Sequence, residues 1–350
     1  MIGARPLVSI VIVNWNGIEH TPTCLESLRR ISYSDYEIIV VDNASTDGSR
    51  ELVRDKFPEA RLVESEANVG FGPGVMRAMP HVRGKYVLVL NNDLEMDPDC
   101  LDKLVDTAEG RPFAAVAGLI LFRDRPRHVN GAGGDMSFLG HGWPRNYERP
   151  VAEVPTAATE VAFCAGGVTL YDRNAFEEVG GFDEDYFIYV EDADLSWRLR
   201  LAGYHICVEP RAVFRHDWDF SRNPRKLYHI ERNRLLMLAK DYSVPALIVI
   251  APALLVYEAS LLVGSFFQGW GRLKLAAYRD AWRALPSARR KRRSVVRRVH
   301  EAEAARAFHG GMHHPEARNP LVRFVLNPFL GAYWWLARPV LRLVGARPSA

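Results

Sequence analysis

Polar side chains with the chemistry to bind a ligand follow three apolar, strand-like runs in the first part of the chain. They are Asn14 and Asn16 after residues 7–13, Asp42, Asn43 and Ser45 after residues 37–41, and Asn92 and Asp93 after residues 86–90. Ligands bind beyond the carboxyl ends of strands in an open α/β sheet, so these side chains are well placed for recognition. Asp42 can accept a hydrogen bond from the ring N–H of a base. Turn and helix-cap chemistry explains Asn43, Ser45 and Asp47 equally well.

Asp93 is a candidate metal ligand. A carboxylate at the end of a strand can hold Mg²⁺ or Mn²⁺ while diphosphate oxygens and water complete the coordination shell. Hard divalent cations prefer such oxygen ligands and neutralise a diphosphate leaving group. An aspartate in the turn after a strand is common by itself, so this interpretation depends on the other motifs.

A second acidic group begins the helix predicted at residues 192–202, which Gly203 ends. The helical pattern places Glu191 and Asp192 at the helix start. The helix dipole favours acidic residues there for purely structural reasons. The same environment keeps a carboxylate ionised, as a general base must be.

The elements that position these residues follow an α/β pattern. Apolar, β-branched runs predict strands at residues 7–13, 37–41, 61–64, 86–90, 116–122 and 161–171, and amphipathic segments predict helices at residues 21–30 and 49–56. The continuous apolar character of three of these runs is typical of buried parallel strands. We therefore expect a mostly parallel central sheet flanked by helices.

The composition changes near residue 240, where we place a boundary between domains 1–240 and 241–350. Residues 244–267 are almost wholly apolar, residues 289–298 are strongly basic, and residues 320–344 are apolar and aromatic with scattered arginines. The second domain is therefore predicted to be a helical, membrane-associated extension.

Other classes of protein fit poorly. The formal net charge of +3 over 350 residues gives no indication of nucleic-acid binding. The four cysteines lie far apart and suit neither a zinc site nor a disulfide scaffold, so we expect reduced thiols. Gly70, Gly72 and Gly74 do not form GxGxxG, because Val75 occupies the last glycine position. A nicotinamide-dependent dehydrogenase is therefore a poor interpretation.

Five segments together resemble glycosyltransferase family 2, most closely its bacterial rhamnosyltransferase-like branch. The segments are VSIVIVNWNG, EIIVVDNASTDGS, YVLVLNNDLEMDPD, FCAGGVTLYDRNAFEEVGGFDEDYF and VEDADLSWRLRLAGY. The resemblance covers about residues 7–240 and implies a GT-A fold. It also implies a divalent metal, Mg²⁺ or Mn²⁺, as cofactor.

The resemblance assigns roles to matching positions. Asp42 and the backbone around Asn14 would face the nucleotide base, and Asp192 of the Glu191–Asp192 pair would be the catalytic base. Asp93 matches the last acidic position of the metal motif, and His216 matches a histidine that completes the metal site. Asn68 and Gly70 lie in a segment that resembles a donor-binding stretch, and Arg232 matches an arginine expected near the diphosphate.

The chain also departs from the family pattern. The metal motif is Asn91-Asn92-Asp93, so one protein carboxylate stands where some members have two, and metal affinity is expected to be weak. Pro73, Val75 and Met76 are unusual in the donor-binding stretch. The QxxRW motif of processive relatives is missing, which predicts transfer of a single sugar.

The resulting hypothesis is an inverting glycosyltransferase that uses a dTDP- or UDP-sugar, with dTDP-rhamnose foremost. The acceptor is expected to be a saccharide or lipid-linked acceptor of a cell-envelope polymer. Two alternatives remain: a nucleotidyltransferase, which would release pyrophosphate, and a non-catalytic nucleotide-sugar binding protein. The Glu191–Asp192 pair argues against the second alternative, since binding alone does not require it.

The apolar run at residues 244–267 is long enough to span a bilayer. Glu258 and Pro252 lie within it, and one crossing would put the basic run 289–298 outside, against the positive-inside preference. We therefore expect an in-plane or re-entrant arrangement on the cytoplasmic side of the cell membrane. The alternative is a buried helix or the interface of a homodimer.

Overall fold

The computed structural model describes residues 5–217, 225–313 and 320–346. The chain forms two compact units, each of which is described by itself. Unit 1 comprises Met1–Gly133, Pro144–Ile188 and Tyr204–Asp219, and unit 2 comprises Gly134–Trp143, Tyr189–Gly203 and Phe220–Ala350. The boundaries of the two units are set by contacts in space. The boundary proposed at residue 240 is set by the change in composition and remains a proposal.

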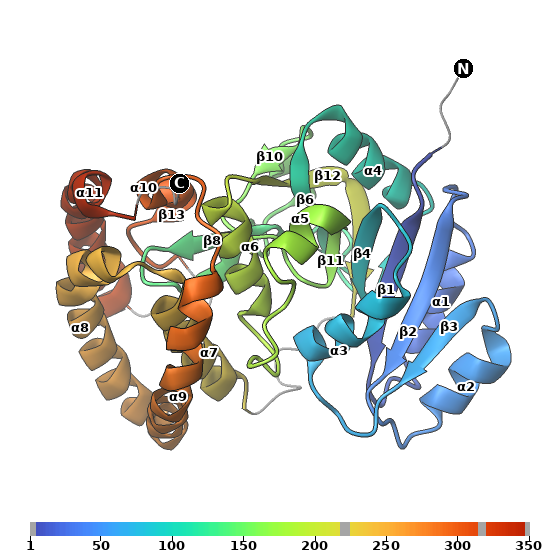
Figure 1. The fold of residues 1–350 in the computed structure, drawn as a ribbon, viewed down its shortest axis with the longest axis horizontal. Helices are drawn as coiled ribbons and strands as arrows, with labels where there is room; N and C mark the ends of the chain where they lie inside the picture. The colour runs from blue at the N-terminus through green and yellow to red at the C-terminus, as the bar shows by residue number, and fades with distance from the viewer. Residues whose placement is uncertain (1–4, 218–224, 314–319, 347–350) are drawn as a thin grey trace. The chain divides into compact units, whose positions relative to one another are not determined.

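Unit 1 is built on a mixed sheet (Figure 1). Its parallel half is ordered β4-β1-β2-β3, with β1 at Val8–Asn14, β2 at Tyr36–Asp42, β3 at Ala60–Glu64 and β4 at Tyr86–Asn91. The first strand is fully apolar apart from Ser9 and Asn14, and its side chains are buried on both faces. The parallel strands predicted from the sequence are thus confirmed. Their carboxyl ends lie in register, with Asn14 opposite Asp42.

The other half of the sheet is ordered β10-β12-β6-β11 and joins β4 through β11. These strands are β6 at Phe113–Phe122, β10 at Thr159–Glu160, β11 at Val168–Asp172 and β12 at His205–His216, with β5 at Leu94–Met96 on β12 and β7 at Val129–Ala132 on β6. The pairing of His216 with Leu94 brings the end of β12 beside the residues that follow β4.

One predicted strand is too long. Of residues 161–171, only those from Val168 onward belong to β11. Gly166 and Gly167 form a turn directly before it, and glycine favours turns over strand interiors. The apolar residues 161–163 are buried, but they form only a β-bridge at Phe163 and do not continue into β11.

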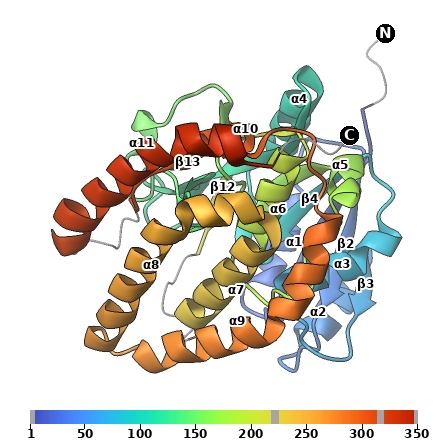
Figure 2. The same ribbon diagram turned by 60° about the vertical axis from the view of Figure 1, so that its left-hand side comes forward.

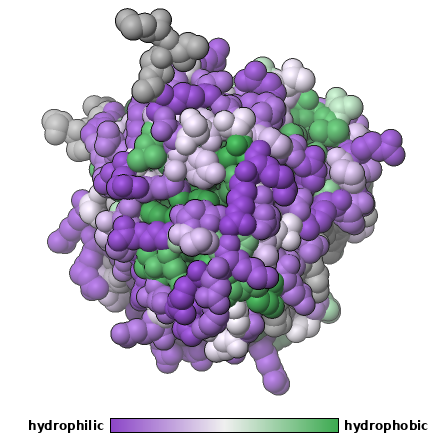
Figure 3. All heavy atoms as spheres, turned by 90° about the vertical axis from the view of Figure 1, so that its right-hand side faces the viewer, coloured by the Kyte–Doolittle hydropathy of each residue, from purple (hydrophilic) through white to green (hydrophobic). Residues whose placement is uncertain are grey.

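Helices cover the sheet of unit 1. They are α1 at Thr21–Leu28, α2 at Ser49–Lys56, α3 at Phe71–Ala78, α4 at Cys100–Gly110 and α5 at Arg173–Glu178, with short 3₁₀ turns η1 at Met79–His81 and η2 at Val151–Glu153. Leu25 and Leu28 of α1 and Leu101 and Leu104 of α4 enter the buried cluster around β1 and β4. On the side of unit 1 that carries α2 and β3, hydrophilic side chains surround a smaller hydrophobic area (Figure 3).

Unit 2 is mostly helical. It contains α6 at Glu191–Leu201, α7 at Lys226–Asp241, α8 at Val244–Phe267, α9 at Gly271–Lys291, α10 at Glu301–Ala304 and α11 at Asn327–Val344, with η4 at Arg292–Ser294, η5 at Ala305–Ala307 and the π-helical η6 at Val322–Leu326. A small sheet of β8 at Gly134–Ser137, β9 at Gly142–Pro144 and β13 at Phe308–His309 completes it. The helix α7 packs on α9, and α8 packs on both α9 and α11 (Figure 2).

The apolar run at residues 244–267 is a helix of 24 residues, α8, long and apolar enough to cross a membrane by length and composition. Its first turn is capped by Ser243, whose hydroxyl accepts a hydrogen bond from the Ala246 N–H. The four cysteines of the chain are free and buried.

Candidate functional site

Asn14, the last residue of β1, joins the ends of three neighbouring segments in unit 1. Its side-chain amide donates to Asp42 Oδ1 at 2.8 Å, and its carbonyl oxygen accepts from the Thr21 hydroxyl at 2.7 Å. The Asn92 amide lies 3.3 Å from the same oxygen. Asn14 and Asp42 are both buried. Asn14 therefore fixes the side chains that follow β1, β2 and β4 relative to one another.

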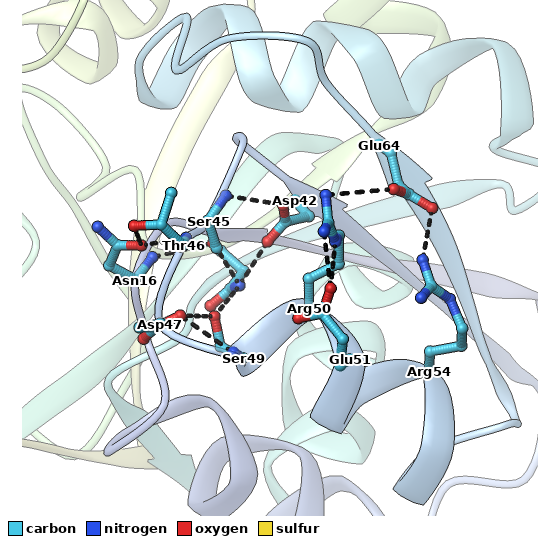
Figure 4. Close-up of polar contacts among 11 residues, drawn as sticks. Asn16, Asp42, Ser45, Thr46, Asp47, Ser49, Arg50, Glu51, Arg54 and Glu64 are labelled. Atoms are coloured by element: carbon cyan, nitrogen blue, oxygen red, sulfur yellow. Dashed lines mark hydrogen bonds and ion pairs between the residues drawn. The ribbon is translucent and has the colours of Figure 1, made fainter.

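The loop between β2 and α2 is held by its own polar side chains (Figure 4). Asp42 Oδ2 accepts from the Ser45 N–H at 2.9 Å, and Asn16 Oδ1 accepts from the Thr46 N–H at 2.8 Å. Asp47 accepts from the Ser49 N–H at 3.0 Å and from the Ile18 N–H at 2.8 Å. These contacts tie the loop after β1 to the loop after β2. The turn and cap chemistry expected of Ser45 and Asp47 is therefore present.

Asn43 connects this loop to the Asn68–Gly70 turn. Its amide donates to the Gly70 carbonyl at 2.9 Å, and Asn68 Oδ1 accepts from the Gly70 N–H at 2.9 Å. Gly70 has φ of +95°, and a Cβ there would lie 2.0 Å from the Phe187 carbonyl oxygen, so only glycine fits. The buried Oδ1 of Asn43 has no hydrogen-bond partner among the described residues.

Asp93 and His216 form the candidate metal site of unit 1. His216 Nε2 lies 3.2 Å from Asp93 Oδ2, and His216 Nδ1 lies 2.9 Å from Asn130 Oδ1. Because the Asn130 oxygen is an acceptor, it favours the tautomer with hydrogen on Nδ1, which leaves a lone pair on Nε2 toward the Asp93 carboxylate. A cation held between that nitrogen and a carboxylate oxygen would suit both groups.

Asp93 and His216 suit a divalent ion whose remaining ligands come from the donor diphosphate and from water. Among the described residues no three His, Cys, Asp or Glu side chains form a metal-binding group. Asp93 and His216 supply one oxygen and one nitrogen, so most of a six-coordinate shell would come from diphosphate and water, the usual mode for Mg²⁺.

Glu191 and Asp192 begin α6 in unit 2. The chain enters this helix through Tyr189 and Val190, whose φ angles are +69° and +73°. A left-handed φ is unusual for a β-branched residue, and such strain recurs at functional sites. The Asp192 side chain accepts from the Ala193 N–H at 2.8 Å.

The two carboxyl groups of this pair have different surroundings. Glu191 is buried, and its Oε2 has no hydrogen-bond partner among the described residues. Burial, with the neighbouring Asp192 and Asp194 charges, raises the pKa of Glu191 well above its usual value. Burial thus favours the neutral form of Glu191, whereas Asp192 is only half-buried. Acid–base sites commonly contain two carboxyl groups whose environments differ in this way, so that one group favours its neutral form.

Arg232 lies on α7, next to the residue that supports the turn before α6. Its guanidinium donates to Asn233 Oδ1 at 2.7 Å, and the Asn233 amide donates to the Tyr189 carbonyl at 2.8 Å. Asn233 is fully buried. The Arg232–Asn233 pair thus belongs to the same part of unit 2 as Glu191 and Asp192.

Residues 9–180 match the profile of glycosyl transferase family 2. The chain is 30% identical over 266 residues to the N-acetylglucosaminyl-diphospho-decaprenol L-rhamnosyltransferase of Mycobacterium tuberculosis, a match that covers 68% of this chain and 85% of the relative.

The chain belongs to glycosyltransferase family 2.

Solved structures agree with this family. GalNAc-T7 with UDP, GalNAc and Mn²⁺ matches with a TM-score of 0.55 at 17% identity, over 68% of this chain and 48% of that one. Residues 1–349 of S. aureus TarS match with a TM-score of 0.52 at 16% identity, over 97% and 90%. The predicted GT-A fold is confirmed, and this family 2 protein is a glycosyltransferase.

Sequence reasoning missed several residues of the site in unit 1. Thr21 binds Asn14 and Asn130 binds His216, although neither belongs to a recognised motif. Ser49, the last residue of the segment EIIVVDNASTDGS, also binds Asn14, but no role was predicted for it from the sequence. Trp15 lies between Asn14 and Asn16 and is 55% exposed. The sequence shows a tryptophan next to the predicted strand, and the structure adds that its exposed ring can offer a stacking surface.

Proposed function

We propose that this protein is a metal-dependent, inverting glycosyltransferase that transfers one sugar from a dTDP- or UDP-sugar. The observation that carries the proposal is the pairing of Asp93 with His216 at 3.2 Å, in the unit that also contains the Asn14–Asp42 network. An oxygen and a nitrogen ligand at the carboxyl end of the sheet suit a cation bound to a diphosphate.

The donor is bound by residues that follow β1 and β2. Asp42 already accepts two hydrogen bonds, from Asn14 and Ser45, but a carboxylate has about four acceptor positions and can still accept a base N–H. The exposed ring of Trp15 offers a stacking surface for the base. Asn16, Asn43 and Ser45 hold the surrounding loops, and Asn68 and Gly70 shape the turn that Asn43 supports.

Asp93 and His216 hold the divalent ion, which when bound neutralises charge on the leaving diphosphate. Asn130 orients the His216 ring, and Asn92 is fixed by its bond to the Thr21 hydroxyl at 2.9 Å. The Mn²⁺ in the structures of GalNAc-T7 and of a mannosyltransferase from Pyrobaculum calidifontis supports a divalent ion here.

Asp192 removes the proton from the acceptor hydroxyl, which then attacks the anomeric carbon as the nucleoside diphosphate leaves. Burial favours the neutral form of Glu191, which would lessen its repulsion of the ionised Asp192 carboxylate. Arg232 is proposed to contact the diphosphate, since a guanidinium pairs well with phosphate oxygens.

The acceptor is proposed to be a lipid-linked saccharide at the cytoplasmic face of the cell membrane. The mycobacterial relative is named for a polyprenyl diphosphate acceptor and for rhamnose. The apolar helix α8 is compatible with work at a membrane. Rhamnose is accordingly the first sugar to test.

The test is a panel of dTDP-, UDP- and GDP-sugars incubated with the full chain, with Mn²⁺ or with excess chelator. Release of a nucleoside diphosphate from a dTDP- or UDP-sugar, dependent on the metal, supports the proposal. Release of pyrophosphate instead identifies a nucleotidyltransferase. Donor binding without turnover, in the presence of polyprenyl-linked acceptors, identifies a binding protein. Full turnover in chelator contradicts the metal site.

A further inference from the structure

Large apolar side chains cover one face of unit 2 that its own core does not use. They include Ile248, Leu255 and Phe267 on α8, which are 69%, 71% and 90% exposed. Phe324 of η6, with Trp335 and Leu343 of α11, is exposed to a similar degree, at 68%, 74% and 76%. Soluble monomers rarely expose so many neighbouring apolar groups. We call the outward sides of α8, η6 and α11 the α8–α11 face (Figure 2).

The helix α8 is almost wholly apolar, and one of its sides is buried while the other is exposed. Ala246, Ile250, Ala253 and Tyr257 recur every three or four residues and are buried in unit 2. Ile248, Pro252 and Leu255 form the opposite, exposed stripe. The hydroxyl of Tyr333 on α11 donates to the Val249 carbonyl at 2.5 Å, which ties the two helices together. One side of α8 is thus committed to the protein and the other is uncovered.

An ionic cluster holds the middle of α8 against α7 and α9. Glu258 forms an ion pair with Arg234 of α7, and its Oε2 accepts from Lys274 Nζ at 2.8 Å and from the Tyr278 hydroxyl at 2.6 Å. Arg234 and Lys274 are both fully buried. Both cations also pair with Glu231 of α7. Withdrawing α8 to span a bilayer would leave that one carboxylate to balance two buried positive charges, which is unfavourable. Glu258, whose charge makes a membrane span unfavourable, therefore holds α8 against α7 and α9 through its ion pairs.

The charges around this face identify its partner. The exposed stripe of α8 carries no charged residue, and residues 320–346 contain three arginines and no acidic residue. Arg323 and Arg342 are exposed, and the Arg338 guanidinium lies over the Trp334 ring. Basic residues beside an apolar surface complement anionic headgroups. A second copy of the chain would bring arginines against arginines.

We propose that the α8–α11 face lies in the plane of an anionic bilayer, with α8 along the membrane surface. This inference rests on the proposed function, because a lipid-linked acceptor requires an enzyme at the membrane. The exposed apolar side chains enter the boundary between headgroups and acyl chains, and Arg323 and Arg342 contact anionic headgroups.

The first test is co-sedimentation of the full chain with phosphatidylcholine vesicles that contain phosphatidylglycerol. Leu255→Gln combined with Leu343→Gln should weaken binding about tenfold or more, because both side chains would enter the bilayer. Leu275→Gln on α9, also at an exposed leucine, should bind like the wild type. Equal loss in the control, or no loss in the double variant, overturns the assignment.

The second test concerns charge. Arg323→Gln combined with Arg342→Gln should remove most of the preference for phosphatidylglycerol and lessen the effect of salt. Sedimentation without vesicles tests the other occupant of this face. A dimer that the double leucine variant dissociates, with vesicle binding unchanged, would show that a second copy covers the face and would overturn the proposal.

The third test separates an in-plane helix from a span. Because the four native cysteines are buried, cysteines introduced at Ile248, Leu255 and Phe267 can be labelled selectively with a fluorophore. An in-plane α8 places all three labels at a similar shallow depth. A spanning α8 of 24 residues is about 36 Å long, so Leu255 would be deep and the ends shallow. That gradient overturns the proposal. Vesicle binding needs no donor, so loss of transferase activity would not alter these results.

Discussion

Asn14 shows what residue types can and cannot predict about this site. Its place at the end of a buried strand indicated a recognition role, but its observed side-chain partners are Asp42, Thr21, Ser45, Ser49 and Asn92. Such partners depend on which strand ends meet, and no local pattern contains that information. The sequence therefore predicted which side chains gather, but it could not predict that most of their hydrogen bonds are to one another.

Asn130 is the clearest residue that sequence reasoning could not find. It comes from β7, far along the chain from Asp93, and reaches His216 only because β7 and β12 both pair with β6. Asn130→Ala should lower the apparent affinity for Mn²⁺ by about 10–100-fold, the usual effect of losing a group that orients a metal-bound histidine. Activity measured against Mn²⁺ concentration checks this, and excess Mn²⁺ should restore it. Asn174→Ala, at an exposed asparagine of α5, is the control. No change in the Mn²⁺ dependence of Asn130→Ala would contradict the metal site.

Glu191 and Asp192 are adjacent in sequence, but we expect their amide variants to differ in turnover. Asp192→Asn should keep donor binding and lower turnover by about 10² or more, the scale of general base catalysis. Glu191→Gln should keep most of the activity, because burial favours the neutral carboxyl form, which an amide resembles. Donor calorimetry and turnover at saturating donor give both quantities. An equal loss in Glu191→Gln would mean that Glu191 must ionise, and collapse of donor affinity in Asp192→Asn would make it a binding residue.

At the scale of elements, apolar patterns in the sequence predicted β1–β4, β6, α1, α2, α6 and α8, the last at its observed limits, but missed α7, α9 and β12, the strand that carries His216. Such patterns could not predict the roles of charges far apart in sequence. Two arginines of the basic run at residues 289–298 bind other parts of unit 2 and not an external ligand such as a lipid headgroup. Arg292 donates to the Ala239 carbonyl at 2.8 Å and Arg297 to the Asp241 carbonyl at 2.8 Å, so both bind the carboxyl end of α7. The arginine density suggested a lipid contact for residues that in fact hold helices together.

His141, between β8 and β9, should make the stability of unit 2 depend on pH. It lies 3.8 Å from Glu231 and 3.4 Å from the Tyr257 hydroxyl. Burial, opposed by the Glu231 charge and assisted by Arg234 and Lys274, lowers the pKa of His141 to about 4 from 6.5. Below pH 6.5 the unfolded chain therefore binds a proton that the folded chain refuses, and stability falls as the pH falls toward 4.

Between about pH 7 and about pH 5 this loss should reach about 2 kcal/mol in the free energy of unfolding. Urea denaturation followed by helical circular dichroism measures it. His141→Gln should remove that part of the pH dependence, because glutamine does not titrate. A second loss is expected at lower pH, since Arg234 and Lys274 overcome burial and hold the pKa of Glu231 at about 2. An unchanged slope in His141→Gln would contradict the assignment.

At the scale of the whole molecule, the chain combines nearly balanced charge with apolar surface on a few helices. The net charge is only +3, so long-range attraction alone would not hold it at a membrane. Exposed apolar side chains on α8 and α11 are needed as well, with arginines beside them. Attachment by two moderate contributions is expected to be reversible, unlike that of a spanning helix.

Cell fractionation should therefore find the full-length protein with the membranes, partly released by high salt and fully by detergent. Salt screens the arginine contribution but leaves the apolar one, whereas detergent replaces the bilayer around both. A tag at the C-terminus should be degraded by protease added to inside-out vesicles and protected in intact cells if α8 lies in the plane of the membrane, as proposed. Combining Leu255→Gln with Leu343→Gln should shift the protein to the soluble fraction in cells, and Leu275→Gln should leave it on the membranes. A tag cleaved in intact cells would mean that the chain crosses the bilayer, and a wild type that is soluble without salt would mean that the α8–α11 face is covered by protein instead.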